Sequence, residues 1–128
     1  MAEYKVVYKD DVENGSILWE PGCPLFTSAV QIARDTKTAA CFLQLKFKNI
    51  SNEVIVGFEG NAVVTYADKT REELTLKYLD ADIAPRAFFR PEALPLKDSE
   101  PVNVEIMISD VVQSKSAWSS TGKPEPLP

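Results

Sequence analysis

The sequence contains no histidine, and this absence excludes several kinds of site. Ser-His-Asp and Cys-His triads need an imidazole as general base, and histidine-ligated metal sites need it as a ligand. The carboxylates show no pair with apolar surroundings, which glycosidase chemistry requires. The five glycines are scattered singly, so the sequence has no Gly-rich phosphate loop. We therefore expect no cofactor, no metal site and no catalytic residues.

Cysteine is scarce, since the chain has only Cys23 and Cys41. Two cysteines are too few for a disulfide framework or a thiolate zinc site. Cys41 falls in an alternating pattern and is expected in the core, whereas Cys23 lies in a Pro-Gly turn and is expected to be the more accessible thiol. We expect both to be unbridged, because no secretory signal precedes them.

Long apolar runs are also missing. The longest runs cover a few residues, which is too short for a membrane span. The N-terminal Met-Ala-Glu-Tyr-Lys lacks the apolar region of a secretory signal, so we expect a cytoplasmic location. The net charge is -5 and the isoelectric point is near 4.8. An acidic chain is repelled by phosphate backbones, so no nucleic-acid partner is expected.

What the sequence does contain is a hydrophobic period of two, which is typical of half-buried strands. Residues 41–48 show it best, residues 102–109 repeat it, and residues 4–8 and 74–78 carry shorter versions. Prolines and polar turn clusters fall between these runs and not inside them. About seven short strands in one domain predict an all-β fold, specifically an immunoglobulin-like or fibronectin-III-like antiparallel β-sandwich.

The domain is expected to span residues 3–113, and residues 114–128 are expected to form a Pro/Ser-rich tail or linker. Such an ending suggests that the natural protein is larger. Within the domain, residues 54–66 have the pattern of a long strand that Gly57 and Gly60 interrupt. Glycine inside a strand indicates a bulge or a close backbone approach. We expect one bent strand there, with two short strands as the alternative.

Three segments carry a resemblance to a family. Residues 18–24 contain a Pro-Gly turn, residues 42–51 form a strand that ends in Lys-Asn-x-Ser, and residues 78–85 end in Ala-Pro. They resemble an uncharacterised group of bacterial immunoglobulin-like domains from Gram-positive anaerobes, some of which carry a zinc ribbon downstream. The resemblance implies a sandwich with an accessory or interaction role, and it supplies no catalytic residues.

The candidate functional residues are Arg86, Phe88, Phe89 and Arg90. Strand alternation cannot bury two consecutive phenylalanines in the same core, so one ring must point away from it. If that ring is exposed between the arginines, it has the composition of a protein interface. The alternative is that the Pro-rich loop of residues 91–101 covers the ring.

Phe58 and Trp19 are expected to extend this surface. The predicted function is a non-enzymatic protein-interaction or accessory module, with a protein partner or a second copy of the chain as ligand. The alternative is a carbohydrate- or small-ligand-binding module, in which Trp19, Trp118 and tyrosines stack on sugar rings. Asn49-Ile50-Ser51 matches a glycosylation sequon, and we expect it to be a turn.

Overall fold

A computed structural model describes residues 3–11 and 21–120. All regular secondary structure in this part of the chain is β-strand. The all-β prediction is confirmed. The described residues form nine strands and not about seven, because three pieces of two or three residues accompany six long strands. The described residues include no helix able to cross a membrane. The strands are β1 (Tyr4–Asp11), β2 (Leu25–Asp35), β3 (Cys41–Asn49), β4 (Ile55–Tyr66), β5 (Arg71–Tyr78), β6 (Phe88–Phe89), β7 (Leu94–Leu96), β8 (Pro101–Gln113) and β9 (Ala117–Ser119).

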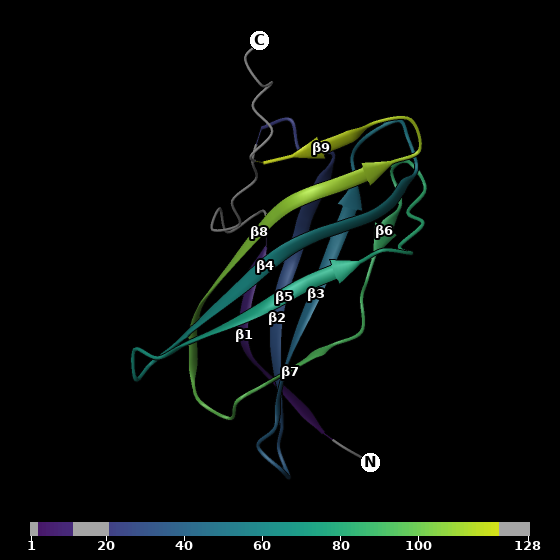
Figure 1. Cartoon of the computed structure of the whole chain (residues 1–128). Helices are drawn as coiled ribbons and strands as arrows, with labels where there is room; N and C mark the ends of the chain where they lie inside the picture. The colour runs from purple at the N-terminus through teal and green to yellow at the C-terminus, as the bar shows by residue number, and fades with distance from the viewer. Residues whose placement is uncertain (1–2, 12–20, 121–128) are drawn as a thin grey trace.

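The strands form two antiparallel sheets (Figure 1). Sheet A has the order β1-β2-β3-β6, and β7 pairs with the opposite end of β3 from β6. Sheet B has the order β5-β4-β8-β9. The inner faces of both sheets contribute to one hydrophobic core, so the sheets pack face to face.

Strand β3 positions the candidate site, and its alternation follows the sequence. Gln44, Lys46 and Lys48 lie on the outer face of sheet A, exposed or half-buried. Because successive side chains point to opposite faces, the residues between them face sheet B. These inward residues are all buried, as predicted: Cys41, Leu43, Leu45 and Phe47.

Strand β4 is continuous and irregular, which confirms the prediction of one bent strand. Its register with β8 shifts between Ile55 and Gly57 and again between Glu59 and Gly60. A Cβ atom at Gly57 would lie 2.8 Å from the backbone oxygen of Tyr78, and one at Gly60 would collide with the backbone of β8. Both glycines therefore allow a close backbone approach.

Aromatic rings join the two sheets in the core. Phe47 of sheet A meets Phe58 of sheet B edge to face, with 5.1 Å between ring centroids. Tyr66, which is 1% exposed, donates its hydroxyl proton to Glu72 Oε1 at 2.5 Å. Lys97 Nζ lies 4.4 Å from the centroid of the Tyr66 ring. The loop after β7 is thereby held against sheet B.

Sheet B continues beyond Gln113, where the tail was expected to begin. The chain turns back and β9 pairs with β8, so that Trp118 lies opposite Val111. The Trp118 side chain is partly buried and packs on the core. Residues 121–128 of the expected tail lie outside the described residues.

Candidate functional site

The segment with the candidate residues is attached to the end of β3. Strand β6 pairs with β3 so that Phe89 lies opposite Phe47 and Phe88 lies opposite Lys48. The amide of Asn49 donates to Ala87 O at 3.0 Å, which extends the pairing by one step. Since opposite residues share a face, this register sends Phe89 into the core and Phe88 to the outer surface.

Phe89 completes the aromatic core. Its ring meets that of Phe58 edge to face at 5.8 Å, with 89° between the planes, and that of Tyr78 at 5.6 Å. Phe58 is 1% exposed and belongs wholly to this core. The expectation that Phe58 extends the outer surface is therefore wrong, because the pairing of β4 with β5 directs it inward against Tyr78. Trp19 lies outside the described residues.

Phe88 points the other way and remains 49% exposed. Lys46 Nζ lies 4.2 Å and Lys48 Nζ 5.3 Å from the centroid of its ring. Both ammonium groups interact with the electron-rich ring face. The prediction that one of the two rings points away from the core is confirmed.

The two arginines have different surroundings. Arg86 adopts a positive φ of 68°. It donates from Nη1 to Ile50 O at 2.5 Å and from Nη2 to Asn52 Oδ1 at 3.1 Å. Its guanidinium therefore fixes the turn after β3. Arg90 is exposed and lines a groove together with Lys46. We call Lys46, Lys48, Phe88 and Arg90 the Phe88 patch.

A shallow groove continues from the Phe88 patch across the outer face of sheet A. One part, of about 330 Å³, lies between Gln31, Gln44, Lys46 and Arg90. A second part, of about 310 Å³, lies beside Tyr4 and shares Gln44 with the first. We call the two parts together the sheet A groove. Its floor holds a cross-strand hydrogen bond, donated by Gln31 Nε2 to Gln44 Oε1 at 2.6 Å.

The aromatic residues form no flat stacking row in the described parts of sheet A. Tyr4 and Phe42 meet edge to face, with 6.2 Å between centroids and 78° between planes. Trp118, expected on a sugar-binding platform, packs against the core instead. The described aromatic residues of sheet A therefore offer no flat platform on which a sugar ring could stack.

The remaining polar motifs have structural surroundings. Asn49 is fully buried, and its Oδ1 accepts a hydrogen bond from the Ser51 amide at 2.9 Å, so the sequon is a turn as predicted. Cys23 and Cys41 are both buried and form no disulfide, so the expected accessibility of Cys23 is wrong. The Cys23 thiol donates to Leu25 O at 3.1 Å. Over residues 3–11 and 21–120, no three metal-ligating side chains gather into a site.

The sequence pointed to Phe88 and Arg90 but missed Lys46, Lys48 and Gln44. These three residues are the polar face of a strand whose outward direction the alternation does predict. The alternation does not predict that the Phe88 segment pairs with β3, because this pairing joins residues that are far apart in the chain. The chain matches no protein-family model, no curated protein and no solved structure.

Proposed function

We propose that this chain is a non-enzymatic interaction module that binds a protein partner through the Phe88 patch. The observation that carries the proposal is the exposed ring of Phe88, which the ammonium groups of two lysines contact while the neighbouring Phe89 is in the core. A large ring in solvent contributes little to folding. Exposed aromatic residues next to arginine are, in contrast, frequent interface anchors.

The charges of the patch indicate the chemistry of the partner. Lys46 and Lys48 place two cations at the Phe88 ring, and Arg90 adds a third in the groove beside Lys46, in a chain whose net charge is -5. A local basic patch on an acidic protein attracts a complementary acidic surface and repels other basic proteins. We therefore propose an acidic peptide segment as ligand, with an apolar side chain on Phe88 and carboxylates beside the cations.

A peptide library displayed on phage and selected against the full chain tests this function. We expect the selected peptides to be rich in Asp and Glu beside an aromatic residue. Their affinity for the Phe88→Ser variant should fall by about tenfold or more. Val112→Ser is the matched control, because Val112 is 50% exposed but lies in sheet B. Peptides without acidic enrichment, or with equal affinity for both variants, would contradict the proposal.

The second candidate is a neutral carbohydrate or small polar ligand in the sheet A groove. The paired amides of Gln31 and Gln44 favour it, since amide side chains commonly bond ligand hydroxyls. Calorimetry with a panel of neutral oligosaccharides separates the candidates. Binding that is lost in Gln44→Ala and kept in Phe88→Ser would support the carbohydrate, and the reverse dependence for peptides would support the protein partner.

We further propose that the fold is of the immunoglobulin-like or fibronectin-III-like kind and serves as an accessory module of a larger bacterial protein. Two antiparallel sheets packed on one core support the first part. An immunoblot of source cells tests the second part. We expect a band well above the 14.2 kDa of this chain, and a band at that mass would contradict the accessory role.

A further inference from the structure

Strand β5 is one of the two edge strands of sheet B, and in the described part of the chain it pairs with β4 alone (Figure 1). Its register with β4 runs from Arg71 to Tyr78 without a shift, and it contains no proline or glycine. A regular edge strand presents a row of backbone donors and acceptors to solvent.

The hydrogen-bond pattern shows which backbone groups face that free edge. The β4–β5 hairpin closes with a bond from the Tyr66 amide to Thr70 O at 2.9 Å. In an antiparallel ladder, every second residue bonds to the same neighbour, so the even-numbered residues of β5 bond to β4. The odd-numbered residues direct their amides to the free edge, and all four are exposed: Arg71, Glu73, Thr75 and Lys77.

The other long edge of sheet B is less suited to pairing. Strand β8 begins at Pro101, and its register shifts opposite Glu59 and Gly60. The amide of Val104 on β8 is occupied, because it donates to Tyr8 Oη at 3.3 Å. Strand β5 therefore offers the longest regular free edge of sheet B.

We propose that β5 pairs with β5 of a second copy of this chain, antiparallel, around a two-fold axis at Thr75. The two B sheets then form one continuous sheet, and each copy contributes the same surface. Thr75 lies opposite Thr75 of the second copy, which is a favourable cross-strand pair. The proposal is independent of the Phe88 patch, which belongs to sheet A.

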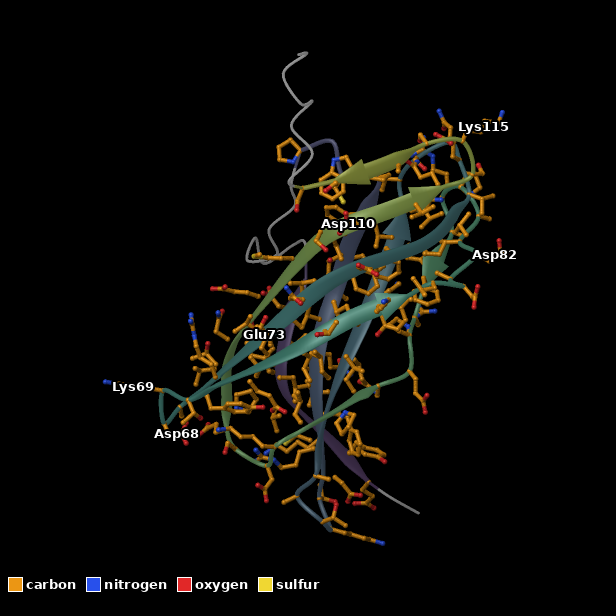
Figure 2. The ribbon with its side chains drawn as sticks, viewed as in Figure 1. Asp68, Lys69, Glu73, Asp82, Asp110 and Lys115 are labelled. Atoms are coloured by element: carbon orange, nitrogen blue, oxygen red, sulfur yellow. The ribbon has the colours of Figure 1, made fainter. Side chains whose placement is uncertain are left out.

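The charges of the outer face agree with this pairing. With the axis at Thr75, Glu73 of each copy lies opposite Lys77 of the other, so one complementary pair forms twice. Figure 2 shows the exposed Glu73 on β5. The Lys77 side chain is 58% exposed and lies 3.6 Å from Glu59 on β4. Pairing would place Lys77 between two carboxylates.

The other registers with an axis between Glu73 and Lys77 lose this complementarity. Moving the axis to Leu74 places Arg71 opposite Lys77, and moving it to Leu76 removes both Glu–Lys pairs. Axes at Glu73 or Lys77 place like charges opposite themselves, which is destabilising. An axis at Glu72 would pair Arg71 with Glu73, but only residues 71–73 of the two β5 strands would overlap. The charge pattern together with the length of overlap therefore favours a second copy with the axis at Thr75.

Sedimentation equilibrium of the full chain near physiological salt tests the proposal, with samples up to about 0.5 mM. We expect a reversible monomer–dimer equilibrium. Thr75→Pro should abolish it, because proline removes an edge donor without removing a bond to β4. Phe88→Ser should leave it unchanged and is the control. A wild-type chain that stays monomeric, or a folded Thr75→Pro variant that still dimerises, overturns the proposal.

If the Thr75→Pro variant fails to fold, substitutions that reverse the charges of Glu73 and Lys77 still test the proposed dimer. Glu73→Lys and Lys77→Glu should each weaken the dimer by about tenfold, since each change acts twice across the two-fold axis. The double exchange should restore association. Melting curves of all variants verify folding, and a double exchange that is weaker than both single variants would overturn the register.

Cysteine substitution tests the position of the axis. Thr75→Cys places the two thiols at the axis, where paired Cα atoms are about 5.5 Å apart and a disulfide can form. Arg71→Cys is the control, because the two copies of that residue lie far from each other in this register. The native thiols are buried and do not compete. Crosslinking of Arg71→Cys at the same rate as Thr75→Cys would exclude the axis at Thr75.

Discussion

The side-chain amide of Asn49 donates a hydrogen bond to the backbone oxygen of Ile83 at 3.0 Å. The same nitrogen donates to Glu53 O at 2.7 Å, and the side-chain oxygen accepts from Ser51. Asn49 is fully buried and connects the end of β3 to two loops. One of these loops leads from Ile83 to Arg86 and Phe88. The Asn49 amide therefore helps to fix the position of the segment that carries the candidate site.

Asn49→Ala should therefore destabilise the chain by about 2–4 kcal/mol, because it leaves several buried polar groups without partners. Urea unfolding at neutral pH measures the change. Asn103→Ala is the control: Asn103 is exposed on β8, and its substitution should cost less than about 0.5 kcal/mol. Similar costs at both positions would contradict the role of Asn49.

Substitutions of Phe47 and Lys46 compare how much the inner and outer faces of β3 contribute to stability. Phe47 is fully buried against Phe58, so Phe47→Ala should cost about 3–5 kcal/mol of stability. Lys46→Ala loses a contact with a half-exposed ring, which is worth less than about 1 kcal/mol. Denaturant unfolding compares the two, and equal losses would mean that the register of β3 is wrong.

The sequence predicts those features of the fold that depend on local alternation. The inward face of β3 follows from neighbouring residues alone, because side chains in a strand alternate strictly. The register shift of β4 beside Gly60 follows from the glycine itself, which is typical of a bulge. The two-sheet arrangement follows from the number and spacing of such strands.

The sequence does not predict features that depend on contacts between distant segments. Cys23 lies in a turn that looks exposed, yet a Cβ atom on the adjacent Gly22 would lie 3.7 Å from Trp118 Nε1. The C-terminal strand β9 therefore packs close to this turn. The pairing of Phe88 with Lys48 is non-local in the same way, which is why the lysines of the patch were missed.

The burial of both cysteines predicts slow reaction with thiol reagents. Cys23 is 3% and Cys41 1% exposed, and neither forms a disulfide. We expect almost no alkylation of the folded chain, and two alkyl groups per chain by intact mass after denaturation without reductant. Labelling of one cysteine in the native state would show that its site opens locally. No labelling after denaturation would show a disulfide.

Tyrosine ionisation predicts a loss of stability at alkaline pH. Burial raises the pKa of Tyr66 above its ordinary value, and its hydrogen bond to the Glu72 carboxylate raises it further. Burial also raises the pKa values of Tyr8 and Tyr78. The folded chain thus favours neutral phenols, and this contribution is complete below the unfolded pKa of about 10 and is lost at higher pH.

Urea unfolding at several pH values from about 8 to 11 measures this effect. The free energy of unfolding should fall as the pH rises through about 10. The fall should be shallower in Tyr66→Phe, which has no ionisable hydroxyl at that position. Some slope should remain in the variant, because Tyr8 and Tyr78 still titrate. An unchanged slope would show that Tyr66 is not the main source of the effect.

The adjacent phenylalanines should respond in opposite ways to the same substitution. Phe89→Ser removes ring contacts with Phe58 and Tyr78 and places a hydroxyl in the core, so a loss of about 3 kcal/mol or more is expected. Phe88→Ser removes a half-exposed ring and should cost less than about 1 kcal/mol. Melting temperatures of the two variants give the comparison, and circular dichroism verifies that the strands remain. If both substitutions unfold the chain, Phe88 is required for folding, and the argument that its exposure serves binding no longer holds.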